Sequence, residues 1–193
     1  MIPARTALML AVSVGGIIAA VSAQSTTTTV VLTGQSMLRS DLRATSPASV
    51  AAIKGMLAGD VVFTNLEAAI AMPGETVREG RGFLAPPESA DALKAMGFNL
   101  LALAGNHAFD LKEAGIRNTL GEVDRRGVVH AGTGRTLAEA AAPAYLRTPK
   151  GTIALVASAS GLIAAGGRAG ADHPGVNELR IKAGDRDRSE EHT

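Results

Sequence analysis

Residues 97–110 read GFNLLALAGNHAFD, and this stretch decides how the rest of the chain is organised. Residues 99–104 form an apolar run, which is typical of a strand covered on both faces, as in a parallel sheet. Gly105 breaks this strand, so Asn106 and His107 fall where the chain leaves the sheet. In open α/β sheets the carboxyl ends of the strands form the edge where ligands bind. This turn is therefore the first candidate for a functional site.

Outward from this stretch, strands and helices alternate along the chain. β-branched and apolar runs predict strands at residues 29–33, 60–66, 99–104 and 128–131, and Gly34 is expected to end the first of them. Capping residues and apolar residues at helical spacing predict helices at residues 48–57, 86–96, 111–126 and 136–142. A turn signal at 149–151 predicts a hairpin of residues 145–148 and 152–158, and residues 68–81 are expected to form a surface loop. This alternation predicts an α/β fold with mainly parallel strands.

Length and composition limit the classes of function. The chain has 193 residues, which suits one domain, and 46% of them are apolar, which allows a sizeable core. The 19 Lys and Arg residues against 18 Asp and Glu residues give a net charge of +1, which does not favour nucleic acid or an anionic membrane surface. Aromatic residues make up only 3% of the chain and offer few stacking platforms for bases. We therefore expect no nucleic-acid partner.

The N-terminal residues have the pattern of a secretory signal. Arg5 supplies a positive charge, residues 7–21 are apolar, and residues 21–23 (VSA) have the small-residue pattern of a cleavage site. The apolar run is shorter than the ~20 residues that a membrane-spanning helix needs. We expect residues 1–23 to be a signal peptide and the protein to be exported to the periplasm or cell exterior, with membrane association only through an uncleaved N-terminus. The absence of cysteine excludes disulfides and thiolate metal sites, and it is compatible with export.

Two predicted strand ends carry polar residues that suit metal binding. Asn65 and Glu67 follow residues 60–64, at the end of the second predicted strand, and Asn106 and His107 follow residues 100–104, at the end of the third. Amide, imidazole and carboxylate groups are ligands that Mn, Fe, Zn or Mg accept. A divalent metal there would polarise a phosphoryl or carbonyl oxygen, or lower the pKa of a bound water. The end of the first strand, where a third ligand is expected, carries Gln35, a neutral and weaker ligand.

Structural interpretations of the same residues remain open. Asn106 is also typical of a turn position with positive φ. His107 is equally suited to capping the following helix or to bonding a buried carbonyl. Asp110 is expected to be the N-cap of the helix at 111–126 rather than a ligand.

Several segments, taken together, resemble the CapA family of capsule synthesis and poly-gamma-glutamate biosynthesis proteins, which are related to calcineurin-like metallophosphatases. They are GDVVFTNLEAAI at 59–70, FLAPPESADALKAMGFNLLALAGNHAFD at 83–110, GVVHAGTGRTLAEAAAPAYL at 127–146 and PGVNELRI at 174–181. The motifs NLE, GFN and GNHAFD, in this order and at this spacing, make the resemblance specific. It implies a layered metallophosphatase-like α/β sandwich with mainly parallel strands and a two-metal centre at the strand ends.

The resemblance also implies roles for single residues. Asn65, Glu67 and Asn106 match metal ligands of the family, and His107 matches the group that protonates a leaving oxygen. Gln35 departs from the family's usual Asp after the first strand, and the distal histidines are absent from the chain. The metal site is therefore expected to be incomplete.

The chain is accordingly interpreted as a C-terminally truncated member of the family. We expect a partial CapA-like domain at residues 27–183, followed by a charged tail at 184–193 that is disordered or artefactual. Residues 188–193 also resemble translated sequencing-adaptor sequence. The lack of a packed final element supports the same interpretation.

Three functions follow from these observations. The first is an exported protein of cell-envelope polymer biosynthesis, such as that of poly-gamma-glutamate. If this protein is catalytic, its reaction is metal-assisted hydrolysis or transfer. The second, favoured by Gln35, is a non-catalytic accessory protein that binds the polymer or its synthase complex. The third is a periplasmic phosphoesterase. If the protein is an enzyme, it is expected to be a metal-dependent hydrolase.

Overall fold

The computed structural model describes residues 27–77 and 82–180. The predicted signal peptide at 1–23 and the predicted tail at 184–193 lie outside the described residues. Within the described part of the chain, no helix is both long and apolar enough to cross a membrane.

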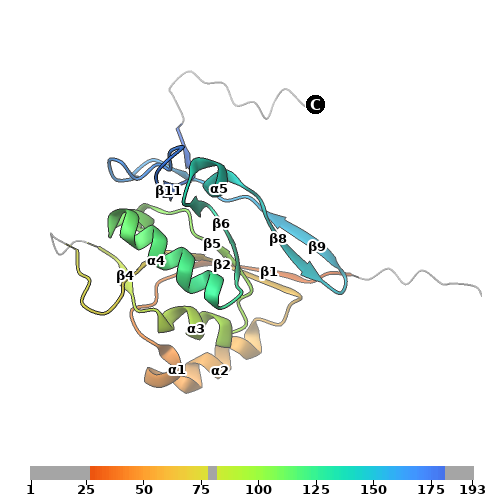
Figure 1. Cartoon of the computed structure of the whole chain (residues 1–193). Coiled ribbons are helices and arrows are strands. Elements are labelled where there is room, and N and C mark those ends of the chain that lie inside the picture. The colour runs from red at the N-terminus through yellow and green to blue at the C-terminus, as the bar shows by residue number, and fades with distance from the viewer. Residues whose placement is uncertain (1–26, 78–81, 181–193) are drawn as a thin grey trace, which may run out of the picture.

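A four-stranded sheet lies at the centre of the molecule (Figure 1), in the order β1–β2–β5–β6. Its strands are β1 (Val30–Ser36), β2 (Val61–Leu66), β5 (Leu100–Ala102) and β6 (Val129–Ala131). All three neighbouring pairs are parallel. The predicted α/β class with a parallel sheet is thereby confirmed. Because the strands are parallel and adjacent, their carboxyl ends lie along one edge of the sheet.

Helices connect the strands. They are α1 (Leu42–Thr45), α2 (Pro47–Met56), α3 (Glu88–Ala95), the 3₁₀ helix η1 (Asn106–Phe109), α4 (Lys112–Arg125) and α5 (Leu137–Ala141). Gly97 (φ 102°) and Gly127 (φ 64°) follow α3 and α4, and this left-handed conformation suits the end of a helix. The four predicted helices are confirmed, with ends that differ by a few residues.

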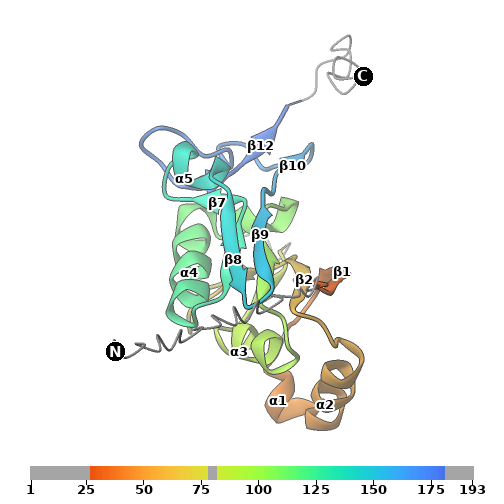
Figure 2. The ribbon, with the colours of Figure 1, turned by 90° about the vertical axis from the view of Figure 1, so that its right-hand side faces the viewer.

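Short strands complete the fold. They are β3 (Ala69–Ile70), β4 (Leu84–Ala85), β7 (Thr133–Gly134), β8 (Ala144–Thr148), β9 (Gly151–Leu155), β10 (Ala159–Ser160), β11 (Gly175–Val176) and β12 (Glu178–Leu179). β8 and β9 form the predicted antiparallel hairpin. In Figure 2 this hairpin runs between the end of the molecule that carries α1 and α2 and the end that carries β10 and β12.

The main core lies between the sheet and the helices. Val62 and Leu101 of the sheet belong to one buried cluster with Leu93 of α3 and with Leu120 and Val123 of α4. Burying one such side chain contributes about 1.5–3 kcal/mol. The other face of the edge strand is open, since Leu32 is 73% exposed.

Two local predictions are wrong. Gly34 does not end the first strand, because β1 continues to pair with β2 as far as Ser36 after a register shift between Leu32 and Gln35. The surface loop expected at 68–81 contains β3, which is buried. Ile70 is fully buried. Its strand β3 pairs with β4, and the Ile70 N–H donates to Thr119 Oγ1 of α4 at 2.9 Å.

Candidate functional site

The carboxyl edge of the sheet carries an open cleft of about 300 Å³. Three of the four predicted site residues line it, namely Asn65, Glu67 and Asn106. The remaining lining residues are Gln35, Ala104, Gly105 and residues 159–162. The sheet explains this convergence, because Gln35 pairs with Asn65 and Asn65 pairs with Ala102 across three adjacent strands.

Glu67 is the centre of the polar contacts in the cleft. The residue is only 6% exposed. Its Oε2 accepts hydrogen bonds from Gln35 Nε2 at 2.7 Å and from Asn65 Nδ2 at 3.1 Å. Two neutral amides therefore satisfy one oxygen of this carboxylate. The Asn65 Oδ1 atom is buried and has no hydrogen-bond partner among the described residues.

His107 does not line the cleft, although Asn106 beside it does. Its Nδ1 lies 2.7 Å from Asp110 Oδ2, and the same oxygen accepts the Phe83 N–H at 2.7 Å. The His107 and Phe83 rings are tilted against each other, with centroids 6.0 Å apart. These contacts orient the imidazole and leave Nε2 as the ring nitrogen that is not turned toward Asp110.

The expectation that Asp110 caps the following helix is wrong. Asp110 is the C-cap of η1, and Leu111 occupies the N-cap position of α4. The Asp110 carboxylate bonds His107 and the Phe83 backbone instead. Because Phe83 lies 27 positions earlier in the chain, no local pattern indicated this role.

Sequence reasoning also missed part of the cleft. As a residue type, Gln35 indicates only a weak ligand, whereas in the structure its amide donates to Glu67. Residues 159–162 line the cleft from β10 and the turn after it. They belong to a stretch rich in Gly and Ala that has no chemistry-bearing pattern, so no sequence signal pointed to them.

The donor set in the cleft does not fit a two-metal centre. The described residues contain no group of three or more His, Cys, Asp or Glu side chains that could hold a metal ion. Among those that line the cleft, Glu67 supplies the only carboxylate, and two N–H groups already point at it. The free Asn65 Oδ1 is a neutral donor and adds no charge. Divalent sites gain affinity from the number of charged ligands, which is low here.

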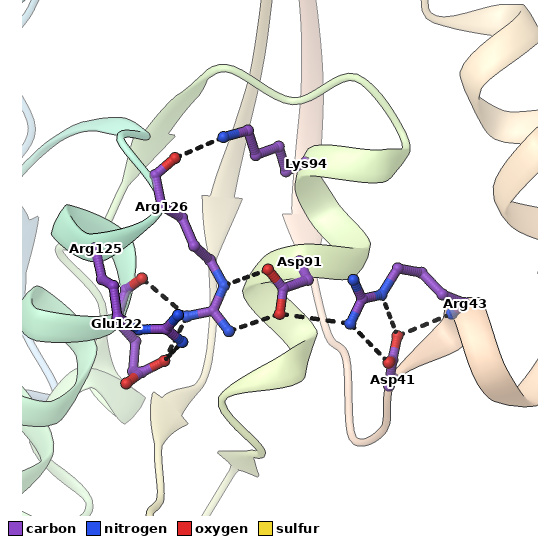
Figure 3. Close-up of polar contacts among 7 residues, drawn as sticks. All are labelled: Asp41, Arg43, Asp91, Lys94, Glu122, Arg125 and Arg126. Atoms are coloured by element: carbon purple, nitrogen blue, oxygen red, sulfur yellow. Dashed lines mark hydrogen bonds and ion pairs between the residues drawn. The ribbon is translucent and has the colours of Figure 1, made fainter.

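A second polar cluster links α1, α3 and α4 (Figure 3). Arg126 donates to both carboxylate oxygens of Asp91 at 2.6 Å and also bonds Glu122 and its backbone carbonyl. The hydrogen bonds from Arg126 lower the pKa of Asp91, and those from Arg125 and then Arg126 lower the pKa of Glu122. The Asp91 carboxylate in turn raises the pKa of Arg126. None of these residues lines the cleft. The cluster joins α3 to the end of α4 through Asp91 and Arg126, and to α1 through Arg43.

The fold and the cleft thus define an α/β protein with a polar site at the carboxyl ends of a parallel sheet. Comparison with known proteins identifies the family. The sequence model of the bacterial capsule synthesis protein family PGA_cap matches residues 29–191, so the chain belongs to this family, and its members take part in capsule synthesis. This agrees with the expected CapA membership.

Two relatives come from Sinorhizobium fredii. They are the uncharacterized proteins y4sH and y4uA, and each is 36% identical to this chain over 137 residues. The match covers 65% of this chain and 30% of each relative. The chain therefore corresponds to less than a third of the length of these relatives.

Proposed function

We propose that the chain is an exported protein that binds a cell-envelope polymer, such as poly-gamma-glutamate, during its synthesis, processing or export. Membership of the capsule synthesis family supports the polymer class. The observation that carries the proposal is the convergence of Gln35, Asn65, Glu67 and Asn106 on one open cleft. An open groove lined by hydrogen-bonding groups suits an extended chain of repeating polar units.

The cleft favours binding over metal-assisted chemistry. Among the described residues, Glu67 supplies its one carboxylate, which accepts from two amides, and the donor set does not fit a two-metal centre. The polymer itself, or the synthase complex that carries it, is therefore the proposed partner. The signal-like N-terminus supports export to the periplasm or cell exterior.

Polymer binding can be tested with a matched pair of neutral substitutions. Asn106→Ala removes an amide that lines the cleft, and Thr152→Ala alters an exposed residue of β9 that does not line it. The expected result is that poly-gamma-glutamate binding, measured by calorimetry, weakens about fivefold in Asn106→Ala, which corresponds to one lost hydrogen bond of about 1 kcal/mol. Thr152→Ala should bind within about twofold of the wild type. Equal affinities in both variants would refute binding at the cleft.

A second candidate, hydrolysis or transfer, is favoured by the geometry of His107. Asp110 holds Nδ1 at 2.7 Å, which orients the ring so that Nε2 is available to move a proton. This candidate predicts that His107→Ala abolishes any polymer-cleaving activity, followed as polymer length, while the melting temperature changes little. The binding proposal predicts instead that polymer affinity survives the same substitution. If stability and function are lost together, His107 is structural.

A further inference from the structure

The hydrogen bonds to Glu67 have a consequence for metal binding. Gln35 Nε2 and Asn65 Nδ2 both donate to Glu67 Oε2, at 2.7 Å and 3.1 Å. Their N–H groups present the positive end of the amide dipole to the oxygen that a cation would have to contact. A divalent ion would have to displace at least one of these donors before it could bind this oxygen.

The cleft offers little to offset that loss. Hard divalent cations take several oxygen ligands, and their affinity increases with the number of charged ones. Apart from the second oxygen of Glu67 itself, the oxygen donors among the described residues that line the cleft are neutral amide, hydroxyl and carbonyl groups. No imidazole and no second carboxylate of the described residues lines it.

We infer that the amide of Gln35 takes the place of a cation at this site, so that the cleft binds its ligand without a metal ion. The amide stabilises the buried Glu67 carboxylate by hydrogen bonding and leaves its negative charge in place. The nature of the ligand rests on the proposed function, but the metal independence of the site does not. The residue at position 35 therefore decides whether this cleft accepts a divalent cation.

An isosteric substitution tests the inference. Gln35→Glu keeps the length of the side chain and replaces the donating N–H group by a carboxylate oxygen beside Glu67. In a calorimetric titration of the chain with MnCl₂, the wild type should bind weakly or not at all. Gln35→Glu should bind Mn²⁺ at least about tenfold more tightly, because a second charged oxygen now faces the first. The double variant Gln35→Glu/Glu67→Gln should lose this gain.

Gln35→Met is the matched control, because it removes the amide and adds no charge. It should bind Mn²⁺ no better than the wild type, because Asn65 Nδ2 still donates to Glu67 Oε2 and no charged oxygen is added. Mn²⁺ should also raise the melting temperature of Gln35→Glu and leave those of Gln35→Met and the wild type unchanged. If Gln35→Glu refolds only in the presence of Mn²⁺, whereas Gln35→Met refolds without it, the result supports the same conclusion.

Three results would overturn the inference. The first is tight Mn²⁺ binding by the wild type that disappears in Glu67→Gln. The second is a folded Gln35→Glu variant with no gain in affinity. The third is an equal gain in Gln35→Met. If Gln35→Glu folds neither with nor without Mn²⁺, the wild type is compared with Glu67→Gln. Equally weak Mn²⁺ binding by these two proteins supports the inference. The titration uses no polymer, so failure of polymer binding would refute the proposed function alone.

Discussion

Removal of the Arg126 guanidinium should destabilise the fold more than removal of any exposed arginine. The Arg126 side chain is 5% exposed and bonds both carboxylate oxygens of Asp91 at 2.6 Å. Breaking a buried ion pair by removing one partner costs about 3–5 kcal/mol. The cost is smaller here because Asp91 is 29% exposed and keeps a contact with Arg43 at 3.4 Å. We therefore expect Arg126→Met to lower the free energy of unfolding by about 2–3 kcal/mol.

Urea unfolding at neutral pH measures this difference, and Arg125→Met is the matched control. Arg125 is the neighbouring residue, is 62% exposed and pairs with Glu122 at 2.7 Å. Exposed pairs contribute about 0–1 kcal/mol, so Arg125→Met should change stability by less than about 1 kcal/mol. The melting temperature of Arg126→Met should fall by about 5–10 °C. If the two variants lose equal stability, the buried network does not stabilise the fold as argued.

The pH dependence of stability gives an independent check. The hydrogen bonds from Arg126 lower the pKa of Asp91 from its ordinary value of 3.8 in the folded state. A group with a lowered pKa stabilises the fold above its unfolded pKa, and this stabilisation is lost as the pH falls through the folded pKa. The stability difference between wild type and Arg126→Met should therefore be largest at neutral pH and shrink below about pH 4. A difference that stays constant down to acidic pH would refute the role of Asp91.

Two further predictions concern single buried contacts, and both can be measured by urea unfolding. Thr119→Val should cost about 1–3 kcal/mol, because it leaves the buried Ile70 N–H without its 2.9 Å acceptor, whereas Thr119→Ser keeps the hydroxyl and should cost less. Gly132→Ala should cost at least about 2 kcal/mol, because Gly132 has φ +107° and a Cβ there would lie 2.7 Å from Ala104 Cβ. Gly127→Ala is the comparison for backbone strain alone, since a Cβ at Gly127 (φ +64°) meets nothing within 4 Å, and its cost should be about 1 kcal/mol.

The sheet could be predicted from sequence because its central strands, β2 and β5, are buried and the strands are separated by helices. The apolar runs around Leu101 and Val62 have no polar alternation, which indicates strands covered on both faces. Once the strands are parallel, their carboxyl ends must meet, so the convergence of Asn65, Glu67 and Asn106 follows from topology. That part of the site required no knowledge of side-chain geometry.

The contacts that sequence could not predict join residues far apart in the chain. Asp110 has the local pattern of a helix cap, but Phe83 supplies a buried N–H that competes for its carboxylate. Asn99, part of the GFN motif, has a structural role, because its side chain accepts from Val62 N–H at 2.8 Å and donates to Asp60 O at 3.0 Å. Neither role is visible in the residue type, since both depend on where a distant backbone group lies.

The position of Gln35 depends on one extra residue in β1. Leu32 pairs with Phe63 and Gln35 pairs with Asn65, so two residues of β1 lie opposite Thr64 alone. Side chains alternate between the faces of a strand, and a shift of one residue moves each to the other face. Without the extra residue, Gly34 would lie opposite Asn65 and the Gln35 amide would not reach Glu67. The bulge therefore determines the chemistry of the cleft, because it places an N–H donor next to the Glu67 carboxylate.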